Sequence, residues 1–243
     1  MFSQPSVTIF GIRIDEPVNT LTDLLVSVVC FYSFYRLKSK AIPGRTIQYL
    51  SMYFLLLGMA TLLGGIIGHG FIYLLSFSWK LPGWILSMIS VAALERSAIQ
   101  HARSYIDPRI SKFFLVLNII ELLTIMSIAM YTLNFRWVEL HSGYGLLAVV
   151  LPFHSYVYLK TRNRGSLIMV MAVMIASVAA LIFMNRISFH SWFNYIDISH
   201  VLMAIAAFVF YKGATLLKSK PESESTISRS KAGLDKRNGK TPS

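Results

Sequence analysis

Hydrophobic residues occur along the chain in long runs that short polar segments separate. Each run has about the length that crosses a hydrocarbon core, roughly 20 residues, and the seven runs lie at about residues 17–36, 47–75, 82–102, 112–133, 137–159, 165–187 and 192–217. Because lipid offers no partners for free backbone groups, each run is expected to be a helix. The pattern predicts an all-α seven-transmembrane helical bundle at residues 16–217. An outer N-terminal segment at 1–15 precedes it, and a disordered basic tail at 218–243 follows.

Composition supports a membrane protein. Hydrophobic residues make up 55% of the chain and charged residues 14%, which excludes a soluble domain of this length. The single cysteine, Cys30, excludes a disulfide framework within one chain. The first apolar run has no basic segment before it and no small-residue cleavage site after it, so it is interpreted as a retained helix.

The basic residues are distributed unevenly between the two sides of the predicted membrane domain. All but four of the 23 Lys and Arg lie in or beside the first, third and fifth connections and the tail; the exceptions are Arg13, Lys80, Arg136 and Arg186. This bias predicts an outer or lumenal N-terminus and a cytoplasmic C-terminus, which agrees with an odd number of spans. We therefore expect an integral, multi-pass protein of the plasma or inner membrane or an endomembrane. Its expected partner is membrane lipid and not nucleic acid, and the sequence indicates no oligomeric state.

A polar face marks the start of the first span. Glu16, Asn19, Thr20 and Asp23 follow one another at the spacing of a single helix face. Ionisable groups are costly within a bilayer, so this face is expected to point into the bundle, and Asp23 is a candidate catalytic residue. The alternative is that Glu16 and Asp23 only cap a helix or pair between helices.

Two later spans bring imidazoles to the same predicted depth. His69 ends the second span in a glycine-rich setting, and Asp197 and His200 are one helical turn apart at the start of the last span. A carboxylate and two imidazoles can hold a divalent metal or orient a catalytic base. His69 and Asp197 are therefore further candidate catalytic residues. A buried Asp–His pair without metal, or an interfacial His69, would explain the same spacing.

Other polar side chains are given no function. Glu139, His141 and His190 are interpreted as hydrated residues near the outer surface. Glu95 and Arg96 are interpreted as the end of the third span, where a basic residue suits the positive side.

These residues together resemble the CREST superfamily of seven-span proteins, which includes alkaline ceramidases and the progestin and adiponectin receptors. The first span of those families opens with Glu, Asn and Thr at intervals of three, which Glu16, Asn19 and Thr22 match. Their second span ends in a histidine, as here in His69. Their seventh span carries a histidine near its start, as here His200 in "SHVL".

The resemblance implies zinc and the hydrolysis of a lipid amide or ester such as ceramide. Family members bind zinc through one histidine of the second span and two of the seventh, with a serine four residues before the first histidine and an aspartate on the third span. This chain departs from that pattern, having Gly65 and Ile196 at the serine and second-histidine positions and Trp84 and Ser87 where the aspartate is expected. Asp197 is the expected substitute ligand in a divergent member.

The leading hypothesis is a zinc-dependent hydrolase with a lipid substrate. His69, Asp197 and His200 would hold the metal and Asp23 would act as base or orienting group, while supporting roles fall to Glu16, Asn19, Thr22 and Asn194. Side chains that hydrogen-bond to metal ligands fix the orientation of those ligands. The site is also compatible with a degenerate form of such a centre.

Two other classes remain open. A non-enzymatic seven-span receptor, lipid-binding or assembly protein would explain the missing serine and histidine. A proton-coupled transporter would use Asp23, Glu121 and Asp197 as relays, although the spans show no doubled half-repeat.

Overall fold

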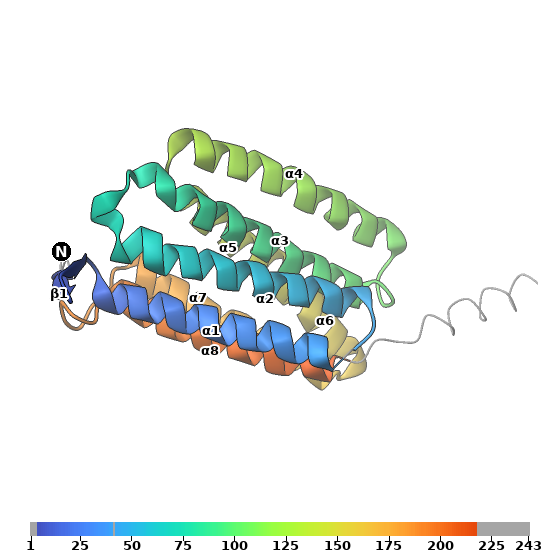
Figure 1. Cartoon of the computed structure of the whole chain (residues 1–243). Helices are drawn as coiled ribbons and strands as arrows, with labels where there is room; N and C mark the ends of the chain where they lie inside the picture. Colours follow the sequence, from blue (N-terminus) through green and yellow to red (C-terminus); the bar gives the residue numbers. More distant parts are fainter. Residues whose placement is uncertain (1–3, 41, 218–243) are drawn as a thin grey trace, which may run out of the picture.

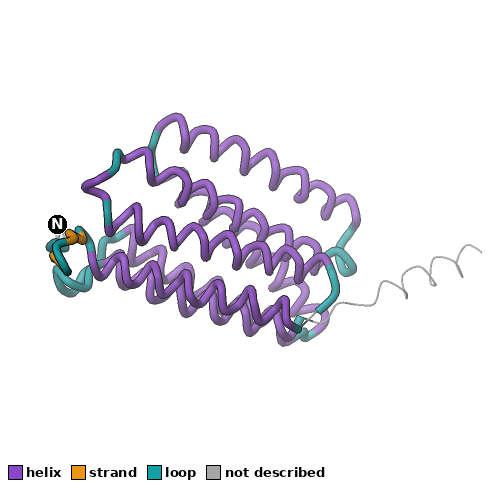
Figure 2. Tube along the Cα trace, viewed as in Figure 1, coloured by secondary structure: helices purple, strands orange, loops and turns teal. Residues whose placement is uncertain are grey.

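The protein is described by a computed structural model that covers residues 4–40 and 42–217 of its 243 residues. A short antiparallel hairpin of β1 (Val7–Ile9) and β2 (Ile12–Ile14) precedes the helices, and nearly all the rest is helical (Figure 2). The predicted tail at 218–243 lies outside the described residues.

Each of the seven predicted spans overlaps helical structure. The α-helices are α1 (Pro17–Ser39), α2 (Arg45–Leu63), α3 (Leu81–Ala102), α4 (Pro108–Thr132), α5 (Arg136–Tyr144), α6 (Leu151–Thr161), α7 (Arg164–Met184) and α8 (Tyr195–Leu216). Two π-helical segments, η1 (Gly64–Gly70) and η4 (Gly145–Val150), continue α2 and join α5 to α6. The 3-10 turns η2 (Ile72–Leu74) and η3 (Phe77–Lys80) lie before α3. The second predicted span was therefore too long at its end, and the last began too early because Asn194 is the N-cap of α8.

In the part of the chain that the structure describes, six helices are long and apolar enough to cross a membrane. They are Pro17–Ser39, Arg45–Gly70, Phe77–Ala102, Pro108–Thr132, Arg164–Met184 and Tyr195–Leu216. The continuous rod formed by α5, η4 and α6 is not among these six. It carries Glu139, His141 and His154, and both of its histidines are fully buried.

The helices form a ring with one helix outside it. Around the ring, α1 packs on α2, α2 on α3, α3 on η4 and α6, α6 on α7, α7 on α8, and α8 on α1 (Figure 1). By contrast, α4 packs against α3 and α5 at the edge of the bundle. The chain thus closes by setting its first and last helices side by side.

The interior of the ring is apolar over most of its length. Its core is made of residues such as Val26, Leu50, Phe54, Leu94, Val150, Met169 and Phe210. At the hairpin end the buried face of α1 is polar instead and presents Asn19, Thr22 and Asp23. The predicted polar face of the first span therefore does point into the bundle.

The rod formed by α5, η4 and α6 is π-helical in its middle, and the sequence gives a reason for this. Pro152 lies at the start of α6 and has no N–H to donate to the preceding turn. A local π-helical stretch relieves the resulting mismatch in the hydrogen-bond ladder, and η4 ends just before this proline.

Small residues let α7 and α8 approach closely. A Cβ added at Gly165 would lie 2.7 Å from the backbone nitrogen of Leu217, and one added at Gly213 would lie 2.8 Å from the sulfur of Met169. Close packing of this type holds helices together where lipid removes the hydrophobic driving force.

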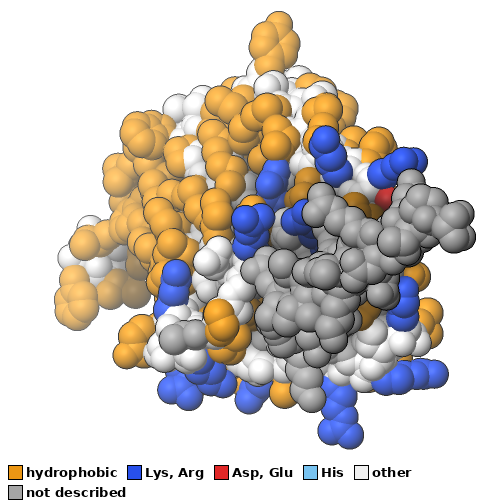
Figure 3. Space-filling model, turned by 90° about the vertical axis from the view of Figure 1, so that its right-hand side faces the viewer, with side chains coloured by type: hydrophobic (Ala, Val, Ile, Leu, Met, Phe, Trp, Pro, Cys, Tyr) orange, Lys and Arg blue, Asp and Glu red, His pale blue; other side chains and the backbone are white. Residues whose placement is uncertain are grey.

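The end of the bundle opposite the hairpin is basic. Lys and Arg side chains gather on this face in Figure 3. They come from helix ends that meet there, and they include Lys38 of α1, Arg45 of α2, Arg109 of α4, Lys160 of α6 and Arg164 of α7.

The backbone contact at Gly165 gives a prediction. Gly165→Ala should lower the free energy of unfolding by about 1–3 kcal/mol, because α7 or the end of α8 must move to admit the methyl group. Gly143→Ala is the matched control, since a Cβ there would meet no heavy atom within 4 Å in the described part of the chain. Thermal unfolding of both variants in the same detergent measures the difference, and equal melting temperatures would contradict the close packing.

Candidate metal centre

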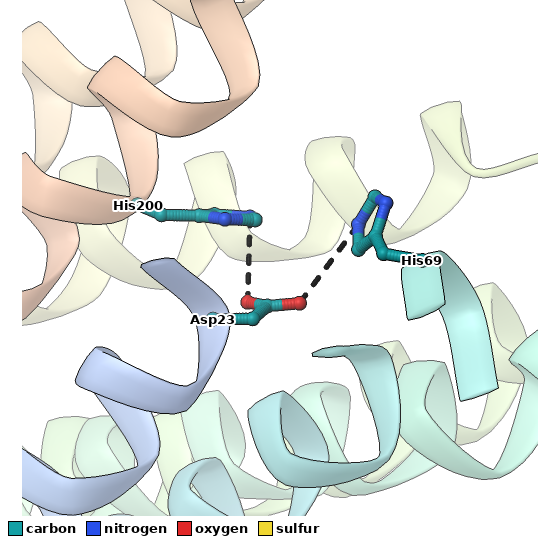
Figure 4. A group of neighbouring side chains, drawn as sticks. All are labelled: Asp23, His69 and His200. Carbon is teal, nitrogen blue, oxygen red and sulfur yellow. Dashed lines mark ion pairs between the residues drawn. The ribbon is translucent and has the colours of Figure 1, made fainter. Parts of the chain in front are cut away.

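Three side chains from distant parts of the sequence meet at the hairpin end of the ring. Asp23 comes from the second turn of α1, His69 from the end of η1 and His200 from the start of α8 (Figure 4). One ligand atom from each lies within 4.8 Å of the other two. The imidazole rings of His69 and His200 are 5.9 Å apart between centroids and stand at 71° to each other.

The carboxylate of Asp23 lies between the two rings. Its Oδ1 is 3.4 Å from Nε2 of His200, and its Oδ2 is 3.8 Å from Nε2 of His69. Only 7% of the Asp23 side chain is exposed, against 12% and 16% for those of His200 and His69. Both imidazoles therefore direct the same ring nitrogen at one buried carboxylate.

The other ring nitrogen of His69 is held by Glu16. Nδ1 of His69 donates to Oε2 of Glu16, which also accepts a hydrogen bond from Nδ2 of Asn19 at 3.1 Å. Partial burial acts to raise the pKa of the Glu16 carboxyl, but the hydrogen bonds from His69 and Asn19 and the nearby ammonium group of Lys80 together lower this pKa by more. The pKa consequently lies below the ordinary value for glutamate, so Glu16 is an ionised acceptor.

The other ring nitrogen of His200 is held by Thr22. Nδ1 of His200 lies 3.1 Å from Oγ1 of Thr22. The Thr22 hydroxyl is 3.0 Å from the carbonyl oxygen of Val18, the usual acceptor for a helical threonine four residues later. When the hydroxyl proton goes to that carbonyl, Thr22 can only accept from His200, and the tautomer that fits carries its proton on Nδ1.

These hydrogen bonds leave acceptors facing one another. With both Nδ1 atoms as donors, each neutral ring turns the lone pair of Nε2 toward the Asp23 carboxylate. Three acceptors around one point repel unless a cation or a proton lies among them. Asn19, on the same face of α1, also has a buried Oδ1 with no partner among the described residues.

The donor set fits zinc. Zn²⁺ takes imidazole nitrogens and carboxylate oxygens in a tetrahedron with bonds of about 2.0–2.2 Å, so that neighbouring ligand atoms lie about 3.3–3.6 Å apart. The 3.4 Å between Oδ1 of Asp23 and Nε2 of His200 matches such an edge, whereas the 3.8 Å from Nε2 of His69 runs to the other oxygen, Oδ2. The hydrogen bonds to Glu16 and Thr22 are the kind that orient metal-binding histidines.

Asp197 has a different set of partners from those of a metal ligand. It is the third residue of a capping box, in which its Oδ2 accepts from the backbone N–H of Asn194 at 2.8 Å while the side chain of Asn194 accepts from the first turn of α8. Its Oδ1 lies 3.4 Å from Oγ1 of Thr22. Geometry therefore groups Asp23 with the two histidines and places Asp197 one layer behind them, beside Thr22.

Gln4 completes this second layer from the N-terminal segment. Its Nε2 donates to Oδ2 of Asp197 at 3.1 Å, and its Oε1 accepts from the backbone N–H groups of Val18 and Asn19 at 2.9 and 3.1 Å. Gln4 thus caps the start of α1 and ties it to α8. No sequence pattern pointed to this residue, because its partners lie far away along the chain.

The glycines of η1 make room for Asp23. A Cβ at Gly64 would lie 2.8 Å from Oδ2 of Asp23, and one at Gly65 would lie 3.1 Å from Cβ of Asp23 and from the carbonyl oxygen of Thr20. Gly65 stands where the CREST pattern has serine. In this chain Cβ of Asp23 and the backbone of Thr20 take up the space that a side chain at position 65 would need.

An open cavity of about 310 Å³ lies at the hairpin beside this centre. It is lined by Gln4, Ser6, Arg13, Asp15, Glu16 and Ile72. Arg13 pairs with Asp15 at 2.6 Å and lies over the ring of Tyr73. Because Glu16 is shared, the cavity reaches the group that holds His69.

Two sequence interpretations outside the centre were wrong. His141 was expected to be hydrated, but it is fully buried, with Nδ1 2.8 Å from Oε2 of Glu121. Glu95 was expected to end its span, but it lies inside α3 and is also fully buried. The carboxylate of Glu121 draws His141 inward, and Asn118 supplies Glu95 with a hydrogen-bond donor at 3.0 Å. His190 is exposed, as expected, and Glu139 is partly exposed.

Comparison with known proteins gives a family but no activity. A scan against family models matches residues 18–219 to one described as "Family of unknown function (DUF6962)". A search of curated proteins finds no match. The matched region contains Asp23, His69 and His200 and begins after the hairpin.

The capping role of Gln4 gives a second prediction. Gln4→Ala should lower the free energy of unfolding by about 1–3 kcal/mol, because two backbone N–H groups of α1 lose their acceptor. Gln48→Ala, at an exposed glutamine of α2, is the control and should change it by less than about 0.5 kcal/mol. Chemical unfolding in detergent measures both, and a Gln4→Ala protein as stable as the control would exclude the cap.

Proposed function

The chain belongs to the DUF6962 family, and we propose that it is a membrane-embedded, zinc-dependent hydrolase of a lipid amide or ester. The observation that carries the proposal is the pair of Nε2 atoms, of His69 and His200, directed at the Asp23 carboxylate while both Nδ1 protons are donated elsewhere. The resemblance to the ceramidase branch of the CREST superfamily, through Glu16, Asn19 and Thr22, adds the substrate class.

The membrane topology forms part of the proposal. Residues 136–161 would be the seventh span, beside the six that are apolar enough on their own. The basic end of the bundle would face the cytoplasm, and the hairpin with the metal centre would face outward or into a lumen. The protein would then be an integral, multi-pass component of a plasma, inner or endomembrane.

The depth of the centre suits a lipid substrate. Asp23 is six residues into α1, which is about 9 Å from its first residue Pro17 along the helix axis. The polar zone on each side of a bilayer is only about 5–8 Å thick, so Asp23 would lie close to where headgroup gives way to hydrocarbon. Ester and amide linkages of lipids lie at this boundary, and the hairpin cavity would accept the polar headgroup above it.

Different residues would bind the ion, orient the imidazole rings and accept a proton. Nε2 of His69, Nε2 of His200 and one oxygen of Asp23 would hold the ion, while Glu16 and Thr22 fix the two rings through their Nδ1 protons. A bound Zn²⁺ supplies Lewis acidity and a water that ionises near neutral pH. The second oxygen of Asp23 would accept the proton of the attacking water, as a general base does.

Metal content tests the centre directly. His200→Ala should lose one zinc ion per chain relative to the wild-type protein, because it removes one of three ligands. His190→Ala is the control, since His190 is exposed at the loop before α8. Elemental analysis of protein purified in detergent and reloaded with zinc gives the stoichiometry. Equal zinc in all three proteins would remove the centre and leave a metal-free Asp–His pair, as expected of a receptor or lipid-binding protein.

The supporting role of Glu16 gives a graded prediction. Glu16→Gln keeps the side-chain shape but weakens the acceptor of the His69 Nδ1 proton, and it should lower zinc affinity by about 10–100-fold. Glu139→Gln, at a partly exposed carboxylate of α5, should leave the affinity unchanged. Competition with a zinc chelator measures both, and equal affinities would contradict a supporting role.

Activity is tested with fluorescent lipids that carry one amide or one ester linkage in mixed micelles. The wild-type protein should hydrolyse at least one of them, and His200→Ala should lose the activity together with its zinc. Hydrolysis that survives the loss of zinc would contradict metal dependence. Zinc binding without hydrolysis of any lipid amide or ester would favour a degenerate centre.

A further inference from the structure

A second cluster of ionisable side chains lies away from the first centre, where α3, α4 and α5 meet. Glu95 of α3, Glu121 of α4 and His141 of α5 each offer one ligand atom within 4.8 Å of the others. Glu121 lies near the middle of α4, one of the helices apolar enough to cross a membrane. Carboxylates at such depth are costly unless something compensates for their charge.

The ring of His141 is oriented like that of a metal ligand. It is fully buried, and its Nε2 donates to the carbonyl oxygen of Met88 at 2.9 Å. This bond leaves Nδ1 for Glu121, whose two oxygens lie 2.9 and 2.8 Å away. A histidine that gives one N–H to a backbone carbonyl presents its other nitrogen in a fixed direction, as metal-binding histidines do.

Glu95 has one oxygen in use and one free. Its Oε2 accepts from Nδ2 of Asn118 at 3.0 Å, and Oδ1 of Asn118 accepts from Nε of Arg96 at 2.7 Å. Its Oε1 is buried and has no hydrogen-bond partner in the described part of the chain. The glutamate itself is 0% exposed, so this oxygen is an acceptor sealed from water.

The free oxygen faces the helix that carries His141. A Cβ added at Gly145 would lie 2.6 Å from Oε1 of Glu95, and Gly145 is four residues after His141, on the same helix face. Gly145 also opens the π-helical segment η4, a distortion that is frequent at functional sites. The unpartnered oxygen therefore points toward the histidine side of the cluster.

The position of α4 outside the ring indicates what the cluster could stabilise. This helix lies outside the ring, and its buried residues are only Ser111, Asn118 and Ala129. In a bilayer such a helix gains little from apolar contact, because lipid tails compete equally well. Asn118 and Glu121 link α4 to α3 and to α5, so the cluster is placed to fasten the outer helix to the bundle.

We propose that Glu95, Glu121 and His141 bind a second divalent transition-metal ion, which pins α4 to α3 and α5. Two carboxylates and one imidazole suit ions such as Zn²⁺ or Mn²⁺. The ion takes the place of the proton between Nδ1 of His141 and Glu121, and it gives Oε1 of Glu95 the partner that it lacks. This site shares no residue with Asp23, His69 and His200, so it does not depend on the proposed hydrolase.

Zinc counting in single and double variants separates the two sites. Full-length protein is stripped of metal in detergent, reloaded with Zn²⁺, desalted and analysed for zinc per chain. The wild-type protein should hold two ions, Glu121→Gln one, His200→Ala one and the double variant none. Glu139→Gln is the matched control and should hold two.

The zinc content of the variants shows which of the two sites binds metal. A Glu121→Gln protein with as much zinc as the wild type would overturn the second site, as would a wild type with a single ion that His200→Ala removes. A single ion that Glu121→Gln removes and His200→Ala keeps would support the second site and exclude the first.

A titration of the wild type covers the case in which Glu121→Gln does not fold. Metal-free protein titrated with Co²⁺ should show two ions bound and a rise in melting temperature with the second-site ion. Binding of one ion, with an absorption spectrum that the His200→Ala variant lacks, would overturn the inference.

Discussion

The polar end of the bundle depends on one buried carboxylate that two imidazoles face. Asp23 lies between Nε2 of His69 and Nε2 of His200, at 3.8 and 3.4 Å, in a region where little of any of the three side chains reaches water. In a low-dielectric interior, acceptors directed at each other are unfavourable unless a positive charge lies among them. A neutral imidazole could relieve this repulsion by donating an Nε2 proton to Asp23. With Glu16 and Thr22 as acceptors of the Nδ1 protons, neither neutral ring has a proton on Nε2. The arrangement therefore calls for a cation or extra protons, and this requirement is the ground for the proposed zinc ion.

The rest of the fold explains how three such distant residues come together. Closure of the ring sets α1 beside both α2 and α8, so that one face of α1 meets the end of η1 and the start of α8. The glycines of η1 let the backbone pass next to Asp23, and the capping box of α8 fixes Asp197 behind Thr22. Gln4 then binds α1 and Asp197 together. Neighbouring residues thus fix the positions of Asp23 and Asp197 at this end of the bundle.

Much of this could be predicted from the sequence, and the misses have physical reasons. Apolar run length predicted the all-helical fold, and the spacing of Asn19 and Asp23 predicted the inward face of α1. The ligand role of Asp197 stays a prediction, while the structure shows Asp197 in a capping box, which the spacing of Asn194 and Asp197 also allows. The roles of Gln4 and of the cluster around Glu95 depend on contacts between segments far apart in sequence, which no local period reveals. The one available signal was Glu121, an acidic residue in the middle of an apolar run.

X-ray absorption at the zinc edge tests the central claim most directly, using a Glu121→Gln protein so that zinc at the second cluster does not contribute. If Asp23, His69 and His200 hold the ion, the first shell contains only nitrogen and oxygen at about 2.0–2.2 Å. Multiple scattering should then fit two imidazoles, and it should fall to one imidazole or vanish when His200→Ala is added. Zinc with a first shell that lacks imidazole scattering, or a protein that takes up no zinc at all, would contradict the centre.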